Sequence, residues 1–288
     1  MQGSDMSAVI PKHNFNAEDV VKTGRTSLYN IAEIRKWLTY MPAFPAVSDE
    51  QIVLFLLACN DSVEFTKSTI TYYFKHRAVA PEFFSNRDVD GDELTFTLKV
   101  TKAAVMPNRT RDNMAVVICG LRDTSYSNFY VESQIKVTLM LVDLICRDNP
   151  ANGFIFVINL KGVGIMHVTR LKLSVVKKFF QYLQEALPIQ LKQIHILNTS
   201  FVFDRIISVL KPFMHKDLYD MIITHPANMN KDEFFKKHIP ADCMPSDFYG
   251  SLPDLDTLSE HTRVQLRRMK EFFEDDEQQM DTYRRNRK

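Results

Sequence analysis

The side chains that most often carry out chemistry are scattered along this chain. It contains eight histidines, four cysteines and eight glycines, without an H-E-x-x-H zinc pattern or a G-x-S-x-G nucleophile turn. Gly162 and Gly164 follow an expected strand, but no third glycine completes a dinucleotide-binding turn, and no phosphate-binding G-x-x-x-x-G-K-[ST] run occurs. We therefore predict no catalytic residue, no metal site and no cofactor.

Two single polar residues deserve separate interpretation. His195 falls within an expected strand, where a histidine is more often a hydrogen-bonded core or edge residue than a metal ligand. Asp143 lies in an apolar helical segment, so it is either an acid with a shifted pKa or a helix residue paired with a nearby cation. The pattern favours the paired residue.

Composition excludes several classes of protein. The chain has 288 residues, of which 45% are hydrophobic and 25% charged, and its formal net charge of +1 gives no overall attraction to nucleic acid. The longest near-apolar run, residues 137–146, carries Asp143 and is too short to span a bilayer. The N-terminus lacks a basic region followed by an apolar one, so we expect no signal peptide and a cytoplasmic protein.

The first ninety residues have a helical pattern. Apolar residues from Leu28 to Leu38 recur on one helical stripe. Ser48 with Gln51, and Asp61 with Glu64, have the spacing of capping boxes that open a second and a third helix. This pattern predicts a three-helix module.

Strands and helices alternate in the remainder of the chain. We expect strands at 113–120, 154–160 and 193–198, helices at 131–148 and 171–187, shorter elements after Pro212, and a long charged helix from Leu255. The fold class is therefore α/β, with an all-α N-terminal module and a mostly parallel sheet. The predicted domains are 1–90, 91–256 and a C-terminal charged helix at 257–288.

Three helical segments are more apolar than one buried stripe requires. These are residues 135–145, 171–187 and 201–210, and the last has only Asp204, Arg205 and Ser208 as polar residues. A helix that is hydrophobic around most of its circumference is buried or meets another apolar body. The pattern alone does not separate a packed core from a cavity.

Four longer stretches are distinctive in combination. They are the helical segment 34–77, "FIFVINLKGVGIMH" (154–167), the helix, strand and apolar helix of 173–214, and "MPSDFYGS" (244–251). Together they resemble the CRAL-TRIO family, whose members include the alpha-tocopherol transfer protein and the cellular retinaldehyde-binding protein. The resemblance covers residues 25–255. Asn159 stands where relatives usually have an acid, Ser251 replaces a second glycine, and Val163 replaces a tryptophan of the tocopherol protein, which leaves the ligand open.

The resemblance implies a lipid cavity closed by a mobile lid. The lid is 201–210, with hinges at 198–200 and at Lys211-Pro212. Thr138 and Tyr182 are the implied polar anchors for a ligand hydroxyl or aldehyde. The full set of implied wall residues is Ile135, Thr138, Leu139, Val142, Phe154, Phe156, Ile158, Val163, Ile165, Leu171, Phe179, Tyr182, Leu183, Leu187, Ile189, Leu191, Ile194, Val202, Phe203, Ile206, Val209 and Leu210. Strand alternation places Phe154, Phe156 and Ile158 on one face.

The resemblance also implies a basic cluster beside the lid. The candidate phosphoinositide-binding residues are Lys192, Lys211, His215 and Lys216. Because several cations must converge on one phosphate, this cluster is open to two interpretations, a phosphoinositide site or a solvated basic edge.

Four functions follow in order of preference. The first is an intracellular carrier of a retinoid, tocopherol, carotenoid or similar lipid that meets membrane surfaces transiently. The second is a phosphatidylinositol or phospholipid exchange protein. An adaptor that docks through its charged C-terminal helix comes third, and an enzyme is the least favoured because no catalytic constellation is present.

Overall fold

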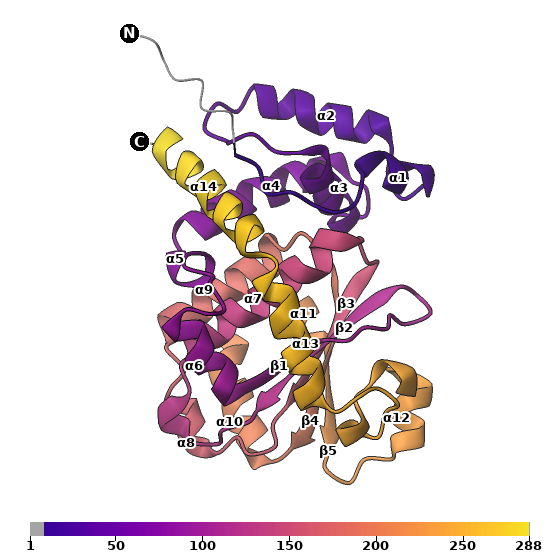
Figure 1. Ribbon diagram of the computed structural model, residues 1–288, viewed down its shortest axis with the longest axis vertical. Helices are drawn as coiled ribbons and strands as arrows, with labels where there is room; N and C mark the ends of the chain where they lie inside the picture. The colour runs from indigo at the N-terminus through magenta and orange to yellow at the C-terminus, as the bar shows by residue number, and fades with distance from the viewer. Residues whose placement is uncertain (1–8, 288) are drawn as a thin grey trace.

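The computed structural model describes residues 9–287, so residues 1–8, on which the signal-peptide expectation partly rests, lie outside the described residues. Figure 1 shows an upper group of N-terminal helices above a layered α/β domain. The helices are α1 (Ala17–Lys22), α2 (Leu28–Thr39), α3 (Asp49–Ala58), α4 (Val63–Ala78), α5 (Pro81–Phe84), α6 (Asp92–Val100), α7 (Val131–Asp148), α8 (Ile165–Val168), α9 (Leu173–Glu185), α10 (Phe201–Leu210), α11 (Lys216–Asp220), α12 (Lys231–Lys237), α13 (Leu255–Arg267) and α14 (Lys270–Asn286). The strands are β1 (Thr101–Val105), β2 (Met114–Leu121), β3 (Gly153–Asn159), β4 (Leu191–Thr199) and β5 (Ile222–Pro226).

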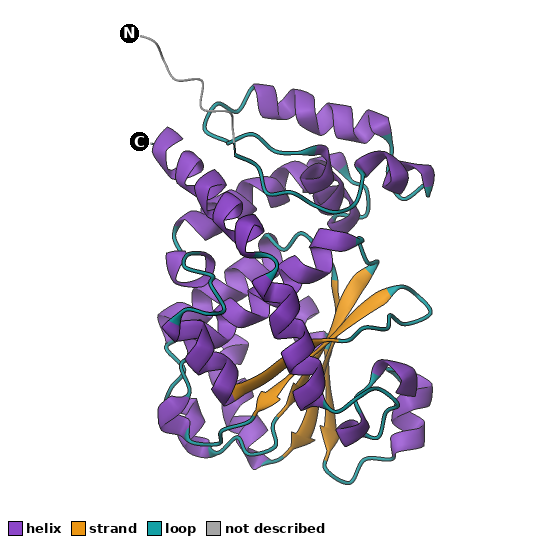
Figure 2. Ribbon diagram, viewed as in Figure 1, coloured by secondary structure: helices purple, strands orange, loops and turns teal. Residues whose placement is uncertain are grey.

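The five strands form one twisted sheet in the order β1-β2-β3-β4-β5 (Figure 2). β2 to β5 pair in parallel through helical crossovers, and β1 pairs antiparallel with β2 at the edge. The predicted mostly parallel sheet is confirmed. The edge strand β1 was not predicted, because its sequence TKAAV is short and carries no turn signal of its own.

The two faces of the sheet carry different helices. Phe154 and Phe156 contribute to the core beneath α7 and α9, whereas Ile155 and Val157 belong to a second core with residues of α12 and α13. Ile158 lies on the same side as Phe156, so the predicted alternation along β3 is confirmed. One face is thus available for a site walled by α7, α9 and the segments that follow them.

The N-terminal helices follow the predicted pattern with one correction. Ser48 and Gln51 form the predicted capping box at the start of α3. The predicted box of Asp61 and Glu64 is wrong, because Ser62 is the N-cap of α4. Asp61 instead has a left-handed φ of 61°, and its carboxylate accepts a hydrogen bond of 2.7 Å from the hydroxyl of Thr26.

The single C-terminal helix expected from Leu255 is two helices in the structure. The chain breaks between α13 and α14 at residues 268–269, and α14 then runs beside α4 (Figure 1). Phe273 and Met280 of α14 are almost completely buried. The charged sequence therefore conceals an apolar face that closes the N-terminal core.

An ion network fixes α14 to the rest of the molecule. Asp276 pairs with Arg77 and with Arg87, and Arg87 also pairs with Asp143 at 2.9 Å. Burial opposes ionisation of Asp276, but the two guanidinium groups outweigh it and hold its pKa below the usual value. Burial raises the pKa of Asp143 to about 6 against the opposing charge of Arg87. Asp143 is the cation-paired helix residue that the sequence favours.

Within residues 9–287, no helix combines the length and the apolarity that crossing a membrane requires.

Candidate functional site

An apolar cavity of about 240 Å³ lies between the sheet and the helices α7, α8, α9 and α10. Ile206 of α10 forms one wall, and Phe156 and Ile158 of β3 form another. The complete lining is Thr101, Ala103, Cys119, Gly120, Leu121, Phe129, Gln134, Ile135, Val137, Thr138, Phe156, Ile158, Asn159, Leu160, Val163, His167, Val168, Leu171, Phe179 and Ile206. Most of these residues are apolar, and the polar ones are Thr101, Gln134, Thr138, Asn159 and His167, so the cavity suits a mainly hydrocarbon guest.

Part of the wall implied by the sequence lines this cavity. The residues that do so are Ile135, Thr138, Phe156, Ile158, Val163, Leu171, Phe179 and Ile206. Others are packed in the cores, namely Leu139, Val142, Phe154, Tyr182, Ile194 and Val202, with Phe203 and Leu210 partly buried against one core and Val209 partly exposed. Leu183, Leu187, Ile189 and Leu191 line a separate pocket, and Ile165 is exposed. The residues expected to line a single chamber are therefore divided between this cavity, a separate pocket, the packed cores and the surface.

The two proposed polar anchors differ in position. Thr138 lines the cavity, and its hydroxyl donates to the backbone oxygen of Gln134 at 2.9 Å. Tyr182 does not line it, and its ring instead packs against Phe84 with a centroid separation of 5.0 Å. Burial raises the pKa of Tyr182 well above its ordinary value.

Sequence reasoning missed the edge of the sheet and the turn after β3. The residues that it missed are Thr101, Ala103, Cys119, Gly120, Leu121, Phe129, Gln134, Val137, Asn159, Leu160, His167 and Val168. Gly162 has a φ of +85°, and a side chain there would collide with Thr124, so this turn requires glycine. The G-x-G pair that carries no nucleotide site is thus a signal for the turn that brings Val163 and His167 to the cavity.

Helix α10 is apolar but poorly buried. Seven of its ten residues are apolar, of which Val202 is buried, Phe201 is 71% exposed and the other five are partly buried. In the neighbouring helix α8, Ile165 is 46% exposed, and at the start of α9, Leu173 is 53% exposed. Three large apolar side chains, one from each of these helices, are thus exposed.

Both ends of α10 are held by a few polar contacts. Before it, Asn198 has a left-handed φ of 56° and donates its side-chain amide to Asn159 at 2.6 Å. Ser200 caps the helix by accepting from the amide of Val202. After it, the Gln184 amide donates to the Phe213 carbonyl at 3.1 Å. These contacts lie in or next to the two segments predicted as hinges. The side-chain oxygen of Asn159 accepts the hydrogen bond from Asn198.

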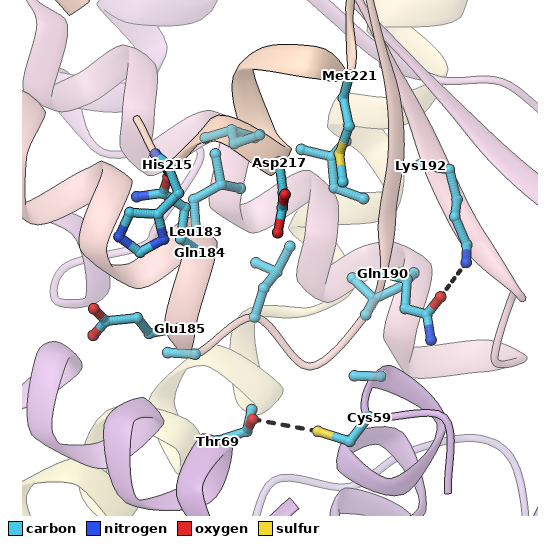
Figure 3. A pocket seen from close by; sticks show the side chains of 16 residues that line it. Cys59, Thr69, Leu183, Gln184, Glu185, Gln190, Lys192, His215, Asp217 and Met221 are labelled. Atoms are coloured by element: carbon cyan, nitrogen blue, oxygen red, sulfur yellow. Dashed lines mark hydrogen bonds between the residues drawn. The ribbon is translucent and has the colours of Figure 1, made fainter. Parts of the chain in front are cut away.

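A second, polar pocket of about 390 Å³ lies where α3 and α4 meet the turn before β4 (Figure 3). Its lining includes Cys59, Thr69, Gln184, Glu185, Gln190, Lys192, His215, Asp217 and Met221. Glu185 is paired with His76 at 2.6 Å, and the Lys192 ammonium donates to the side chain of Gln190. Because Asp217 also faces this space (Figure 3), acidic and basic groups are mixed here.

The four predicted phosphoinositide-binding residues are only partly gathered. Lys192 and His215 line the polar pocket. The Lys211 ammonium instead lies 4.5 Å from the centroid of the Tyr219 ring. Lys216 pairs with an aspartate one turn along α11, and its side chain is 83% exposed. The cations do not converge on one point in this conformation.

Three histidines meet on the opposite side of β4 and β5. The Nδ1 atom of His195 lies 2.9 Å from Nε2 of His225, and the ring of His238 lies 5.0 Å from that of His195. Burial, with the neighbouring histidines, lowers the pKa of His195 to about 3. No group of three or more His, Cys, Asp or Glu within residues 9–287 is arranged to hold a metal ion.

Comparison with protein families gives matches to both parts of the chain. The family described as "CRAL/TRIO domain" matches residues 99–250, which are more than half of the chain. The family described as "Pinta-like, UBA domain" matches residues 25–94. The chain belongs to the CRAL/TRIO family. Members of this family bind and transfer lipids, and the cavity beneath α10 lies within the matched CRAL/TRIO residues.

Two relatives match this chain at low sequence identity. An alpha-tocopherol transfer protein-like protein of Mus musculus is 24% identical over 229 residues, which are 78% of this chain and 64% of that protein. Clavesin-1 of Xenopus laevis is 22% identical over 231 residues, which are 79% of this chain and 69% of that protein. The chain spans less than two thirds of the alpha-tocopherol transfer protein-like relatives. A crystal structure of Sfh5 gives a TM-score of 0.43 at 14% identity, covering 66% of this chain and 67% of that one.

Proposed function

We propose that this CRAL/TRIO protein is a cytoplasmic carrier of a small apolar lipid, such as a retinoid, tocopherol or carotenoid, and that α10 is its lid. The observation that carries the proposal is the apolar cavity beneath a helix whose own apolar side chains are mostly only partly buried. A lid needs this composition because its inner face meets cargo and its outer face meets a bilayer. Binding and release then depend on α10 moving away from the cavity.

The cavity volume favours movement of α10 on loading. At about 240 Å³ it is smaller than most ligand pockets, which have volumes of about 300–1,000 Å³. Ile206 is the one lid residue in its wall, so an outward shift of α10 enlarges the space without disturbing the sheet. Phe203 and Leu210 hold the lid against the core containing Val176 and Phe180.

Energetics support carriage as the task. Burying a methylene group stabilises by about 0.8 kcal/mol, so a chain of about fifteen carbons contributes roughly 12 kcal/mol before the costs of binding. Such a lipid leaves a membrane slowly by itself. A dry cavity makes it transportable, and an apolar lid that enters the bilayer provides the route out.

The test is to isolate the protein from cells without detergent, extract the bound lipid and identify it by mass spectrometry. We expect a small apolar lipid, and we expect Ala103→Phe, which fills the cavity from β1, to abolish its retention. A diacyl phospholipid as the dominant species would instead favour an exchange protein. Retention of the small lipid by Ala103→Phe would show that the cargo lies elsewhere.

A further inference from the structure

One side chain in the lining of the apolar cavity has an unused hydrogen-bonding atom. His167 is only 6% exposed and lines the cavity. Its Nε2 atom is buried and has no hydrogen-bond partner among the residues that the structure describes. The Thr138 hydroxyl and the Asn159 amide oxygen, which also line the cavity, have partners within the chain. A buried polar atom left without a partner is rare and destabilising.

The other ring nitrogen determines what Nε2 can do. Two groups of Gly164 lie near Nδ1, the backbone N–H at 3.0 Å and the carbonyl oxygen at 3.3 Å. The carbonyl already accepts from the backbone N–H of His167 at 3.0 Å. We assign the shorter contact, in which the amide N–H donates and Nδ1 accepts and carries no proton. In this tautomer the ring proton is on Nε2. The aromatic neighbour, Phe129 at 5.8 Å between centroids, is at best a weak acceptor.

We propose that the Nε2–H of His167 becomes the polar anchor of the cavity when its walls move apart on loading, and that the cargo carries an oxygen acceptor, a hydroxyl or carbonyl, at the α8 end. This inference rests on the proposed carrier function and adds a chemical requirement to it. Pure hydrocarbons leave the donor unpaired, and lipids with one oxygen at the end of an apolar body satisfy it. A lipid without an oxygen acceptor should bind more weakly, because the desolvated Nε2–H of His167 then has no hydrogen-bond partner.

The experiment uses two retinoids that differ by one oxygen. The full chain is incubated with phosphatidylcholine vesicles containing equal amounts of all-trans-retinol and its deoxy hydrocarbon analogue, and the retinoids bound to the re-isolated protein are quantified by chromatography. We expect the native chain to enrich retinol about tenfold over the hydrocarbon.

Two variants separate the anchor from the structural contact with Gly164. In His167→Asn the amide oxygen replaces Nδ1 and keeps the acceptor for Gly164, but nothing reaches the position of Nε2. We expect this variant to bind both retinoids with a ratio near one. In His167→Gln the amide nitrogen reaches the Nε2 position, and we expect the preference for retinol to return in part.

The possible results are distinguishable. A native ratio near one, or the native ratio retained in His167→Asn, would overturn the role of His167 while leaving the carrier function intact. Uptake of phosphatidylcholine in place of both retinoids would reject the small-lipid cargo and this inference with it. Uptake of no lipid at all would contradict the proposed function itself.

Discussion

Helices α7 and α10 are both rich in apolar residues, but the structure treats them differently. α7 buries twelve of its eighteen residues between the sheet and the surrounding helices. α10 buries one of its ten, although seven of them are apolar. Apolar sequence is therefore found both in a permanent core and in a partly buried surface helix, and burial tells the two apart.

The energetic support of the two regions differs in the same way. The core that contains α7 is fastened to α14 through the paired charges of Arg87, Asp143 and Asp276. The lid is held by Phe203, Leu210 and a few hydrogen bonds at its ends. Changes near α14 should thus alter stability, and changes in α10 should alter transfer.

The largest expected effect is on stability, from Asp276→Asn in α14. This change leaves Arg77 and Arg87 buried with less compensating charge, and we expect the free energy of unfolding to fall by about 3–5 kcal/mol in chemical denaturation. Asp281→Asn, on the same helix but in an exposed pair with Arg284, should change it by less than about 1 kcal/mol. Equal effects of the two changes would contradict the structural role of the network.

The next effect is on function, from Phe203→Asp in the lid. A carboxylate there is incompatible with packing against Val176 and Phe180, so we expect lipid transfer between vesicles to fall more than tenfold. Phe201→Asp is the matched change at an exposed position, and it should slow release to membranes while cargo binding persists. Normal transfer by Phe203→Asp would remove the basis for treating α10 as a lid.

A third prediction concerns pH and the histidines behind the sheet. The pKa of His195 is lowered from 6.5 to about 3, so the unfolded chain binds a proton below pH 6.5 that the folded chain does not. The stabilising contribution is present above pH 6.5 and is lost as the pH falls toward 3. At pH 5 the loss is about 2 kcal/mol. His195→Gln should reduce the pH dependence of unfolding by this amount, whereas an unchanged dependence would show that the site does not titrate as described.

The smallest effect is expected at the basic edge beside α11. If Lys211 belongs to a solvated edge, Lys211→Ala should weaken binding to anionic vesicles by about 1 kcal/mol at low salt. The loss should be the same for phosphoinositide and phosphatidylserine vesicles of equal charge. A loss confined to phosphoinositide vesicles would establish a specific site and show that the cations converge in another conformation.

Local pattern predicted the fold well where elements are long or periodic. α7 begins and ends at the predicted residues, and the alternation along β3 gave the correct faces. β1 was not predicted, because its pairing with β2 depends on residues distant in the sequence rather than on its own five residues. The break between α13 and α14 was not predicted, because the sequence there consists of residues that favour helix.

The cavity could be predicted only in part for the same reason. Ile135 and Phe179 lie in apolar helical segments, and the family resemblance implied that they line a cavity. Ala103 and Cys119 belong to it through strand pairing, which leaves no local signal. Tyr182 has a hydroxyl suited to anchoring a ligand, but its ring faces the N-terminal helices. Neighbouring positions on a helix point in directions about 100° apart, so an error of one residue in the helix orientation changes which side chain faces the cavity.

The most direct test of the central claim is a crystal structure of the full chain after loading from vesicles. We predict continuous density for one lipid between Phe156 and Ile206, with its oxygen beside His167 and α10 displaced outward. A cavity that stays vacant, or that is closed by side chains while lipid binds elsewhere, would contradict the account.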